Sequence, residues 1–383
     1  MMPMRLGPVS WVLHAYVALR IGLGLPTVWA GVAFALAMAG SAWLLPHAFG
    51  AGGRRGTGSR LRTAALVAMG FGSSLLVFTV LRDVALAGYA LAGRVADLPW
   101  PFADVERASA LGVLALAVLA SALGFAAARR TARVVRVSVP VDGLAPALDG
   151  FTIAQLSDVH VGPTIRRRDV AAIVERVNGL GADMVAITGD LVDGSVAELA
   201  DEVAPLGGLA SREGTFFVTG NHEYYAGAAS WIAHLRRLGM RVLLNEHATV
   251  GRGGASLVVA GVTDVSAGHF DRSHASDPVR ALAGSPEGAF RLLLAHQPRS
   301  AAAAAAAGAD LQLSGHTHGG QFWPWNHFVR LQQPFTAGLS RLGRMWIYTS
   351  RGTGYWGPPK RVGAPSEITL LTLRRAVTGG AAA

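Results

Sequence analysis

Three stretches in the first third of the chain each run for about 20 residues without a charged side chain, the length that an α-helix needs to cross the hydrocarbon core of a bilayer. They cover residues 27–45, 63–81 and 108–128. A weaker apolar stretch at residues 6–19 lies before Arg20 and Pro26 and predicts a further helix. A cleaved signal peptide fits this start poorly, because no small-residue cleavage site is followed by a polar sequence. The sequence therefore predicts a membrane region of about four helices.

The positive charge of the chain is concentrated around these stretches. The formal net charge is +10, of which residues 1–137 contribute +9 and residues 138–383 only +1. Membrane proteins collect basic residues on their cytoplasmic flanks, so this excess belongs to the membrane region and does not predict a nucleic-acid surface. Lys360 is the only lysine, which we attribute to compositional bias.

The basic residues also predict an orientation. Arginines follow the second predicted helix at positions 54, 55, 60 and 62, and the fourth at positions 129, 130, 133 and 136. The connection at residues 82–107 mixes both signs of charge and is expected to be an outward loop. The positive-inside rule then places both termini, and everything after residue 129, in the cytoplasm.

After about residue 137 the pattern changes to short apolar runs that alternate with helical periodicity. Strands are expected at residues 151–156, 184–188, 216–219, 257–260, 292–295, 311–313, 346–349 and 368–373, and helices at 167–178, 229–238 and 301–307. Strands alternating with helices predict a layered α/β domain. We therefore expect a transmembrane region at 1–130, a catalytic domain at 137–375 and a disordered tail at 376–383. The chain has no cysteine, which excludes disulfides and thiolate metal ligands.

Five polar clusters each follow one of these apolar runs. They are Asp158-Val-His160, Gly189-Asp190-Leu-Val-Asp193, Gly220-Asn221-His222-Glu223, His296 before Gln-Pro, and Gly315-His316-Thr-His318-Gly-Gly-Gln321. Ligands of open α/β sheets gather beyond the carboxyl ends of the strands, so the clusters are expected to meet in space. Imidazoles and carboxylates together suit Mn, Fe or Zn, whereas Mg prefers oxygen ligands. The donors exceed what one ion requires, which predicts two divalent metal ions, the arrangement that clamps both oxygens of a displacement at phosphorus.

These clusters, in this order, resemble the motifs of the calcineurin-like metallophosphoesterase superfamily. The form of the last cluster and the closing residues 350–354 and 359–370 are similar to a membrane-associated bacterial group of the YkuE and YaeI type. The resemblance implies a four-layer β-sandwich flanked by helices, a bacterial inner-membrane location and two divalent ions, of which Mn fits best and Fe, Zn or Mg remain open. One departure is Ala364-Pro365-Ser366-Glu367, where the group has two prolines, and it touches no implied ligand.

The resemblance also assigns roles to individual residues. It implies that Asp158, His160 and His318 hold one metal, that Asn221, His296 and His316 hold the other, and that Asp190 bridges them. Water activated between the ions would attack phosphorus, with His222 donating a proton or neutralising charge and Asp193 orienting it. Glu223 is expected to be structural, and Gln321 and Arg351 are candidates for substrate or supporting contacts.

The predicted function is a membrane-anchored phosphodiesterase or pyrophosphatase. Confinement to a membrane suggests lipid-linked phosphates, such as UDP-2,3-diacylglucosamine, and a role in lipid metabolism. Two alternatives stay open: a catalytically silent scaffold or sensor with the same fold, and a nucleotide or nucleic-acid phosphodiesterase. Residues 322–325, Phe-Trp-Pro-Trp, fit either the membrane interface or a packed loop beside the site.

Overall fold

The computed structural model describes residues 6–48 and 57–376, which form two compact units. A helical unit comprises Met1–Arg129 and Gly357–Val362, and a sheet unit comprises Arg130–Trp356 and Gly363–Ala383. The chain thus returns to the helical unit for six residues near its end, a feature that the predicted domain limits did not include. The predicted tail at 376–383 lies outside the described residues except for Ala376.

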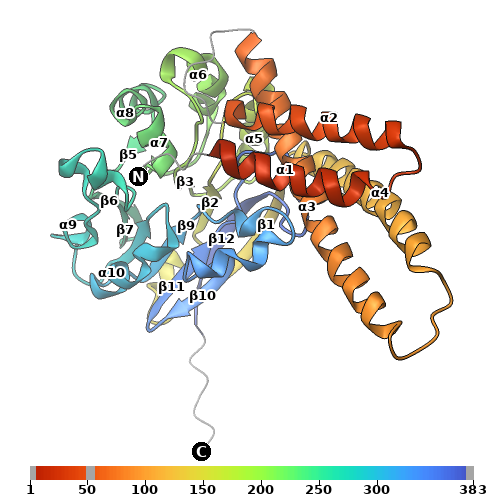
Figure 1. The fold of residues 1–383 in the computed structure, drawn as a ribbon. Coiled ribbons are helices and arrows are strands. Elements are labelled where there is room, and N and C mark those ends of the chain that lie inside the picture. The colour runs from red at the N-terminus through yellow and green to blue at the C-terminus, as the bar shows by residue number, and fades with distance from the viewer. Residues whose placement is uncertain (1–5, 49–56, 377–383) are drawn as a thin grey trace, which may run out of the picture. The chain divides into compact units, whose positions relative to one another are not determined.

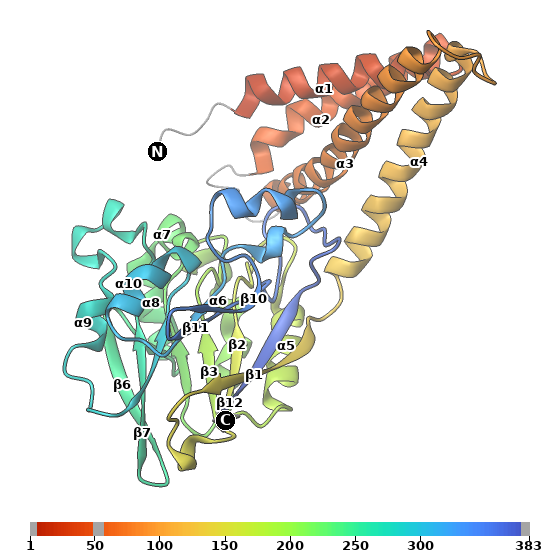
Figure 2. The same ribbon diagram turned by 90° about the horizontal axis from the view of Figure 1, so that it is seen from below.

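The helical unit contains the four expected helices. They are α1 (Leu6–Gly22), α2 (Val28–Leu44), α3 (Thr57–Ala92) and α4 (Phe102–Ala128), with a short 3₁₀ turn η1 (Leu45–Ala48) after α2. Figure 2 shows α3 and α4 running side by side. Within residues 6–48 and 57–376, three segments are long and apolar enough to cross a membrane, namely Val28–Ala48, Arg60–Ala92 and Phe102–Ala128. Arg54 and Arg55, on which the orientation partly depends, lie outside the described residues.

The predicted extent of the outward loop, residues 82–107, was wrong. Helix α3 continues to Ala92 and α4 starts at Phe102, so the connection is much shorter. The charges at positions 82 and 83 do not end the helix because they are paired. Arg82 donates to the Glu106 carbonyl at 2.9 Å and to the Ser109 hydroxyl at 2.9 Å. Asp83 accepts two hydrogen bonds from the Arg20 guanidinium at 2.8 and 3.0 Å.

The sheet unit consists of two six-stranded mixed sheets with helices outside them (Figure 1). The first sheet has the order β1-β12-β2-β3-β4-β5, with β1 (Arg133–Val141), β12 (Glu367–Arg375), β2 (Thr152–Leu156), β3 (Met184–Ile187), β4 (Thr215–Phe217) and β5 (Arg241–Val242). The second has the order β10-β11-β9-β8-β7-β6, with β10 (Gly338–Leu342), β11 (Met345–Thr349), β9 (Leu311–Ser314), β8 (Phe290–Leu294), β7 (Ala255–Gly261) and β6 (Glu246–Arg252). This is the expected α/β sandwich.

A buried apolar core joins the facing sides of the two sheets. Ile153, Met184 and Phe216 from the first sheet belong to the same cluster as Leu292 and Leu311 from the second. The outer layers contain α5 (Arg167–Asn178), α6 (Val196–Val203), α7 (Asn221–Ala226), α8 (Ala228–Arg237), α9 (Pro278–Leu282) and α10 (Ala301–Ala306). Burial of the inner faces removes the central strands from water, which explains their nearly continuous apolar sequences.

Four strands were missing from the prediction, and they are the four edges of the two sheets. The first sheet ends in β1 and β5, and the second in β6 and β10. Edge strands carry polar and charged side chains that prevent pairing with other chains, so they lack the apolar run that marks a central strand. Strand β1, for example, has the sequence RVVRVSVPV and is exposed at alternate positions from Arg136 to Pro140.

Candidate metal centre

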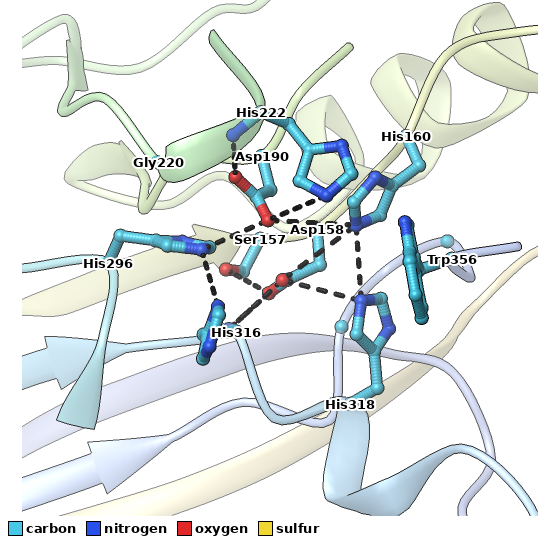
Figure 3. Close-up of polar contacts among 12 residues, drawn as sticks. Ser157, Asp158, His160, Asp190, Gly220, His222, His296, His316, His318 and Trp356 are labelled. Atoms are coloured by element: carbon cyan, nitrogen blue, oxygen red, sulfur yellow. Dashed lines mark hydrogen bonds and ion pairs between the residues drawn. The ribbon is translucent and has the colours of Figure 1, made fainter. Parts of the chain in front are cut away.

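The five polar clusters follow the carboxyl ends of five parallel strands. Strands β2, β3 and β4 of the first sheet lead into the clusters at Asp158, Asp190 and Asn221. Strands β8 and β9 of the second sheet lead into those at His296 and His316. Figure 3 shows their side chains pointing toward one another around the two central carboxylates. The two sheets therefore each supply part of one polar site.

The backbone is left-handed at most of these side chains. Asp158, His160, Asp190, His316 and His318 have φ between 51° and 68°. Residues with a Cβ seldom adopt this conformation, and where it persists the surrounding structure enforces it, often at a functional site. The unusual backbone turns each donor side chain directly off the end of its strand toward the centre.

Asp158, His160 and His318 form what we call the first histidine group. The Nε2 atoms of the two imidazoles are 3.1 Å apart. Asp158 Oδ1 lies 3.5 Å from His318 Nε2 and 4.0 Å from His160 Nε2. The Asp158 carboxylate also accepts the backbone N–H of His316 at 3.0 Å, which ties the first and last clusters together. The three side chains thus present three donor atoms to one point.

Asp190, His296 and His316 form the second histidine group. Asp190 Oδ2 is 3.1 Å from His296 Nε2, which in turn is 3.2 Å from His316 Nδ1. These ligand atoms also lie within 4.8 Å of one another. The His296 side chain is fully buried, since it sits between the ends of β8 and β3.

The far nitrogens of two imidazoles have partners that determine their tautomers. His160 donates through Nδ1 to Asp193 Oδ1 at 2.8 Å, and His296 donates through Nδ1 to the Thr188 carbonyl at 2.8 Å. Each acceptor requires a proton on Nδ1, which leaves the Nε2 lone pair facing the centre. Metal-binding histidines are typically oriented by such contacts.

Asp190 belongs to the second histidine group and also faces the first. Its Oδ2 faces His296 at 3.1 Å and His160 at 3.9 Å, whereas its Oδ1 accepts the backbone N–H of His222 at 2.8 Å. A Cβ on Gly220 would come within 2.2 Å of that Oδ1, so only glycine allows this approach. The Asp190 carboxylate would therefore be available to both ions, with its Oδ2 facing the side chains of both groups.

His222 stands beside the groups without belonging to either. Its Nδ1 donates to Asp193 Oδ1 at 2.7 Å, the same oxygen that His160 uses, and its Nε2 lies 3.9 Å from Asp190 Oδ2. Asp193 is thus shared by one candidate ligand and the candidate proton donor. Glu223 is structural, as expected: its buried carboxylate accepts three backbone N–H groups, those of Asp190, Leu191 and Gly220.

The donor spacing fits divalent cations. Metal bonds of about 2.0–2.2 Å with tetrahedral or octahedral angles separate two ligand atoms by about 3.0–3.5 Å. The nitrogen pairs at 3.1 and 3.2 Å lie in that range. Among the described residues, buried Asn221 Oδ1 has no hydrogen-bond partner, as expected for an oxygen that serves as a metal ligand.

The side chains of the second histidine group hold opposite charges. Burial would raise the pKa of Asp190, but His296 and His222 lower it well below its usual value. Burial likewise opposes a charge on His296, yet Asp190 raises its pKa well above 6.5. Burial and the charge of His296 lower the pKa of His316 to about 3. Without a cation the second group therefore retains a proton on His296 at neutral pH.

Without a cation, the pKa of His222 is also raised. Burial lowers its pKa, but the carboxylates of Asp190 and Asp193 outweigh burial and raise it to about 9. A protonated imidazole with a fixed Nδ1 partner can donate through Nε2 to a leaving oxygen. The geometry therefore suits the proton-donor role that the motif implied.

Two residues named from the sequence turn out to be held by the protein itself. The Gln321 side chain accepts the backbone N–H of Trp356 at 2.8 Å and donates to the carbonyl of the same residue at 2.9 Å. Arg351 donates to buried Glu367 at 3.0 Å. Neither side chain is directed by these contacts toward the candidate ligands.

The sequence analysis missed the aromatic neighbours of His222. The Tyr225 ring lies 5.2 Å from the His222 ring, edge-on. The Trp356 ring lies 6.2 Å from it, also edge-on (Figure 3). Tyr225 follows its motif by two residues and could have been suspected from that position. No local signal marked Trp356, which is 134 positions away from His222 in the chain.

Comparisons with known proteins show which proteins this chain resembles. Residues 151–320 match the family model described as calcineurin-like phosphoesterase. A transmembrane protein with metallophosphoesterase domain from Bos taurus is 42% identical over 279 residues, which is 70% of this chain and 62% of that protein. An uncharacterized metallophosphoesterase of Campylobacter jejuni is 37% identical over 68% of this chain and 69% of its own length. The uncharacterized metallophosphoesterase YkuE of Bacillus subtilis is 30% identical over 59% and 80%, respectively.

The chain covers less than two thirds of the bovine relative but more than two thirds of both bacterial ones. The family model spans the clusters from Asp158 to His318, that is, both histidine groups and His222. On this evidence the chain belongs to the calcineurin-like metallophosphoesterase family.

Proposed function

We propose that this protein is a membrane-anchored phosphodiesterase or pyrophosphatase that works with two divalent ions. The observation that carries the proposal is the position of Asp190 Oδ2, which lies between the two histidine groups and beside His222. Two ions in these groups would polarise the phosphoryl oxygens and lower the pKa of water. Asp158, His160 and His318 would hold one ion, and Asn221, His296 and His316 the other, with Asp190 between them.

The remaining chemistry belongs to the side chains. His222 donates a proton through Nε2 to the leaving oxygen, and Asp193 holds its Nδ1 so that the ring keeps this direction. Glu223 stabilises the turn that carries Asp190 by accepting its backbone N–H. The tight turn at Gly220 keeps the Asp190 carboxylate close to the His222 backbone.

The proposed setting is a bacterial inner membrane, with the sheet unit in the cytoplasm and Mn as the preferred metal. The basic residues at 129, 130, 133 and 136 support this orientation. A lipid-linked phosphate such as UDP-2,3-diacylglucosamine is the proposed physiological substrate, because three candidate spans confine the enzyme to a membrane.

The silent-scaffold alternative requires loss of a catalytic part, and none of the implied ligands or the donor is lost here. The nuclease alternative requires a basic nucleic-acid surface, and residues 138–383 carry a net charge of only +1. A nucleotide substrate stays compatible with the site.

Activity of the detergent-purified full chain tests the proposal. With Mn, the protein should hydrolyse bis-p-nitrophenyl phosphate, and His222→Asn should lower turnover on a phosphodiester with an alkyl leaving group while the metal content stays constant. If folded protein with bound metal shows no turnover on any phosphodiester or pyrophosphate, with Mn, Fe, Zn or Mg, the silent scaffold becomes the correct description.

A further inference from the structure

The nearly neutral second part of the chain contains one strongly basic segment. Between Asp310 and Glu367 there is no acidic residue, and the basic residues are Arg330, Arg341, Arg344, Arg351, Lys360 and Arg361. The same segment contains the last motif, with His316 and His318. Arg330, Arg341 and Arg344 are exposed, whereas Lys360 and Arg361 are buried and Arg351 pairs with buried Glu367. Exposed arginines next to a phosphate-processing site favour an anionic partner or substrate.

Exposed apolar side chains occur in the middle of this segment. Residues 322–331, which we call the aromatic loop, directly follow Gln321. Within it Trp325 is 41% exposed, Phe328 53% and Leu331 83%, and the Trp325 and Phe328 rings are 6.0 Å apart. Neighbouring exposed apolar groups of this size typically mark an interaction surface.

The segment Gly357–Val362, a little further along, packs inside the helical unit. The Lys360 ammonium is buried there and donates to the Gly70 carbonyl at 3.1 Å, to the Ser121 hydroxyl at 3.3 Å and to the Ser74 hydroxyl. These partners belong to α3 and α4, which contain two candidate membrane spans. The attribution of Lys360 to compositional bias therefore missed a specific structural role.

The fit of this segment against α4 depends on a glycine. Arg361 N–H donates to the Gly124 carbonyl at 3.0 Å, and a Cβ at Gly124 would come within 2.7 Å of Lys360 Cγ. Gly124 is four residues before the end of α4, which corresponds to about 6 Å along a helix. The segment therefore lies beside the last turns of a candidate span.

The start of the aromatic loop contacts the residues that flank the segment Gly357–Val362 on both sides. Gln321 bonds the backbone of Trp356, the residue before Gly357. Phe322 pairs with Gly363, the residue after Val362. Chain connectivity and these contacts keep the start of the aromatic loop close to residues that are covalently joined to the helical unit.

We propose that the aromatic loop binds the anionic surface of the bilayer and receives the substrate from it. Trp and Phe side chains are favoured at the level of the lipid head groups, and basic residues such as Arg330 are attracted to anionic lipids. His316 and His318 precede the loop by only a few residues, so a lipid-linked phosphate held at this surface reaches the candidate metal centre. This substrate assignment rests on the proposed function, whereas membrane contact of the loop does not.

A single label tests the membrane contact. Because the chain has no cysteine, Phe328→Cys and Leu331→Cys each provide one site for an environment-sensitive fluorophore. The control is Val279→Cys on α9, which is 68% exposed. In full-length protein reconstituted in vesicles, lipids with a quencher in the head-group region should quench both loop labels at least about twofold more than the control. Equal quenching at the loop and control positions would overturn the proposal.

Lipid composition and a competitor separate the possible partners. The extra quenching should be greater in vesicles with anionic lipid than in purely zwitterionic vesicles, and should fall with Arg330→Glu. If a single-stranded oligonucleotide instead displaces the lipid and changes the fluorescence of the loop label, the surface binds nucleic acid and the proposal is wrong.

Turnover tests the substrate assignment. In Phe328→Asp, the ratio of turnover on a vesicle-embedded phosphodiester to turnover on bis-p-nitrophenyl phosphate should fall about tenfold relative to wild type, with Val279→Asp as control. An unchanged ratio would refute delivery through the loop. Failure of the wild type on both substrates would refute the proposed function, while the quenching result would still decide the membrane contact.

Discussion

The two histidine groups have the same kinds of donors but are supported differently. In the first group, His160 is oriented by the side chain of Asp193, and the same carboxylate oxygen orients His222. In the second group, His296 is oriented by the main-chain carbonyl of Thr188, at the end of β3. The first histidine group therefore depends on a side chain, Asp193, that also contacts the proton donor. The second depends on the backbone at the end of strand β3 of the first sheet.

This difference shows where substitution can separate metal binding from proton transfer. A carbonyl of the main chain cannot be removed without changing the fold, so the second group is fixed once β3 and β8 have paired with their neighbours. The support of the first group can be removed by changing one carboxylate. We expect substitution to change metal binding selectively in the first histidine group. We expect metal binding in both groups to depend on Asp190.

Asp190→Asn should have the largest effect. Its Oδ2 faces both groups, so the substitution removes a negative charge from each, and turnover on bis-p-nitrophenyl phosphate should fall at least about a thousandfold. Metal analysis of the purified protein should show loss from both sites. Asp142→Asn is the control, because Asp142 is exposed and pairs with exposed Arg341. Retention of one tenth of the activity would exclude a bridging role.

His222→Asn should lower turnover about a hundredfold without loss of metal. The reduction should be greatest for substrates with alkyl leaving groups, which need a proton, and small for p-nitrophenolate, which leaves without one. Comparison of kcat for the two substrate types provides the measurement, with Tyr225→Phe as a neighbouring control. An equal reduction for both would show that His222 neutralises charge and does not donate a proton.

Asp193→Asn should weaken the first group selectively. Loss of a supporting carboxylate typically lowers metal affinity or activity by about ten- to a hundredfold. Titration of metal-depleted protein with Mn should then show one weakened and one unchanged site, whereas wild type binds both tightly. If both sites weaken equally, the second group also depends on Asp193 and the proposed division between the groups is incorrect.

The smallest expected effect is the release of a proton from His296 when metal binds the second histidine group. Since the pKa of His296 is raised well above 6.5, its proton must leave when a metal binds the second group at pH 7. The apparent affinity of that site should therefore rise with pH, by at most about tenfold per unit, until the pH reaches the His296 pKa. Calorimetry in buffers with different ionisation enthalpies measures the release. Heats that do not depend on the buffer would show that His296 is neutral before metal binds.

The central strands and their polar ends could be predicted from sequence because both signals are local. Apolar runs such as 184–188 mark strands that are buried on both faces, and the polar cluster after each run marks the strand end. The edge strands could not be found in the same way, because β1 and β6 are partly exposed and mix polar with apolar residues.

Charged residues within α3 misled the prediction for a related reason. Arg82 and Asp83 resemble the start of a loop when only their own charge is considered. Their partners, Arg20 and the Glu106 carbonyl, come from α1 and α4, and pairing removes the cost of placing them in the helical unit. Nothing in the residues around position 82 reveals those partners.

The sequence by itself determined which segments are apolar enough to cross a membrane, which donor types follow the strands, and to which family the chain belongs. Only the tertiary structure decided how the donors are grouped, that Asp193 is shared by His160 and His222, and that Lys360 is buried between α3 and α4. The physical reason is the distance along the sequence over which each property acts. Periodicity and hydrophobicity are properties of neighbouring residues, whereas contacts such as His160 with His318 join positions 158 apart, and the packing of the two sheets against each other creates them.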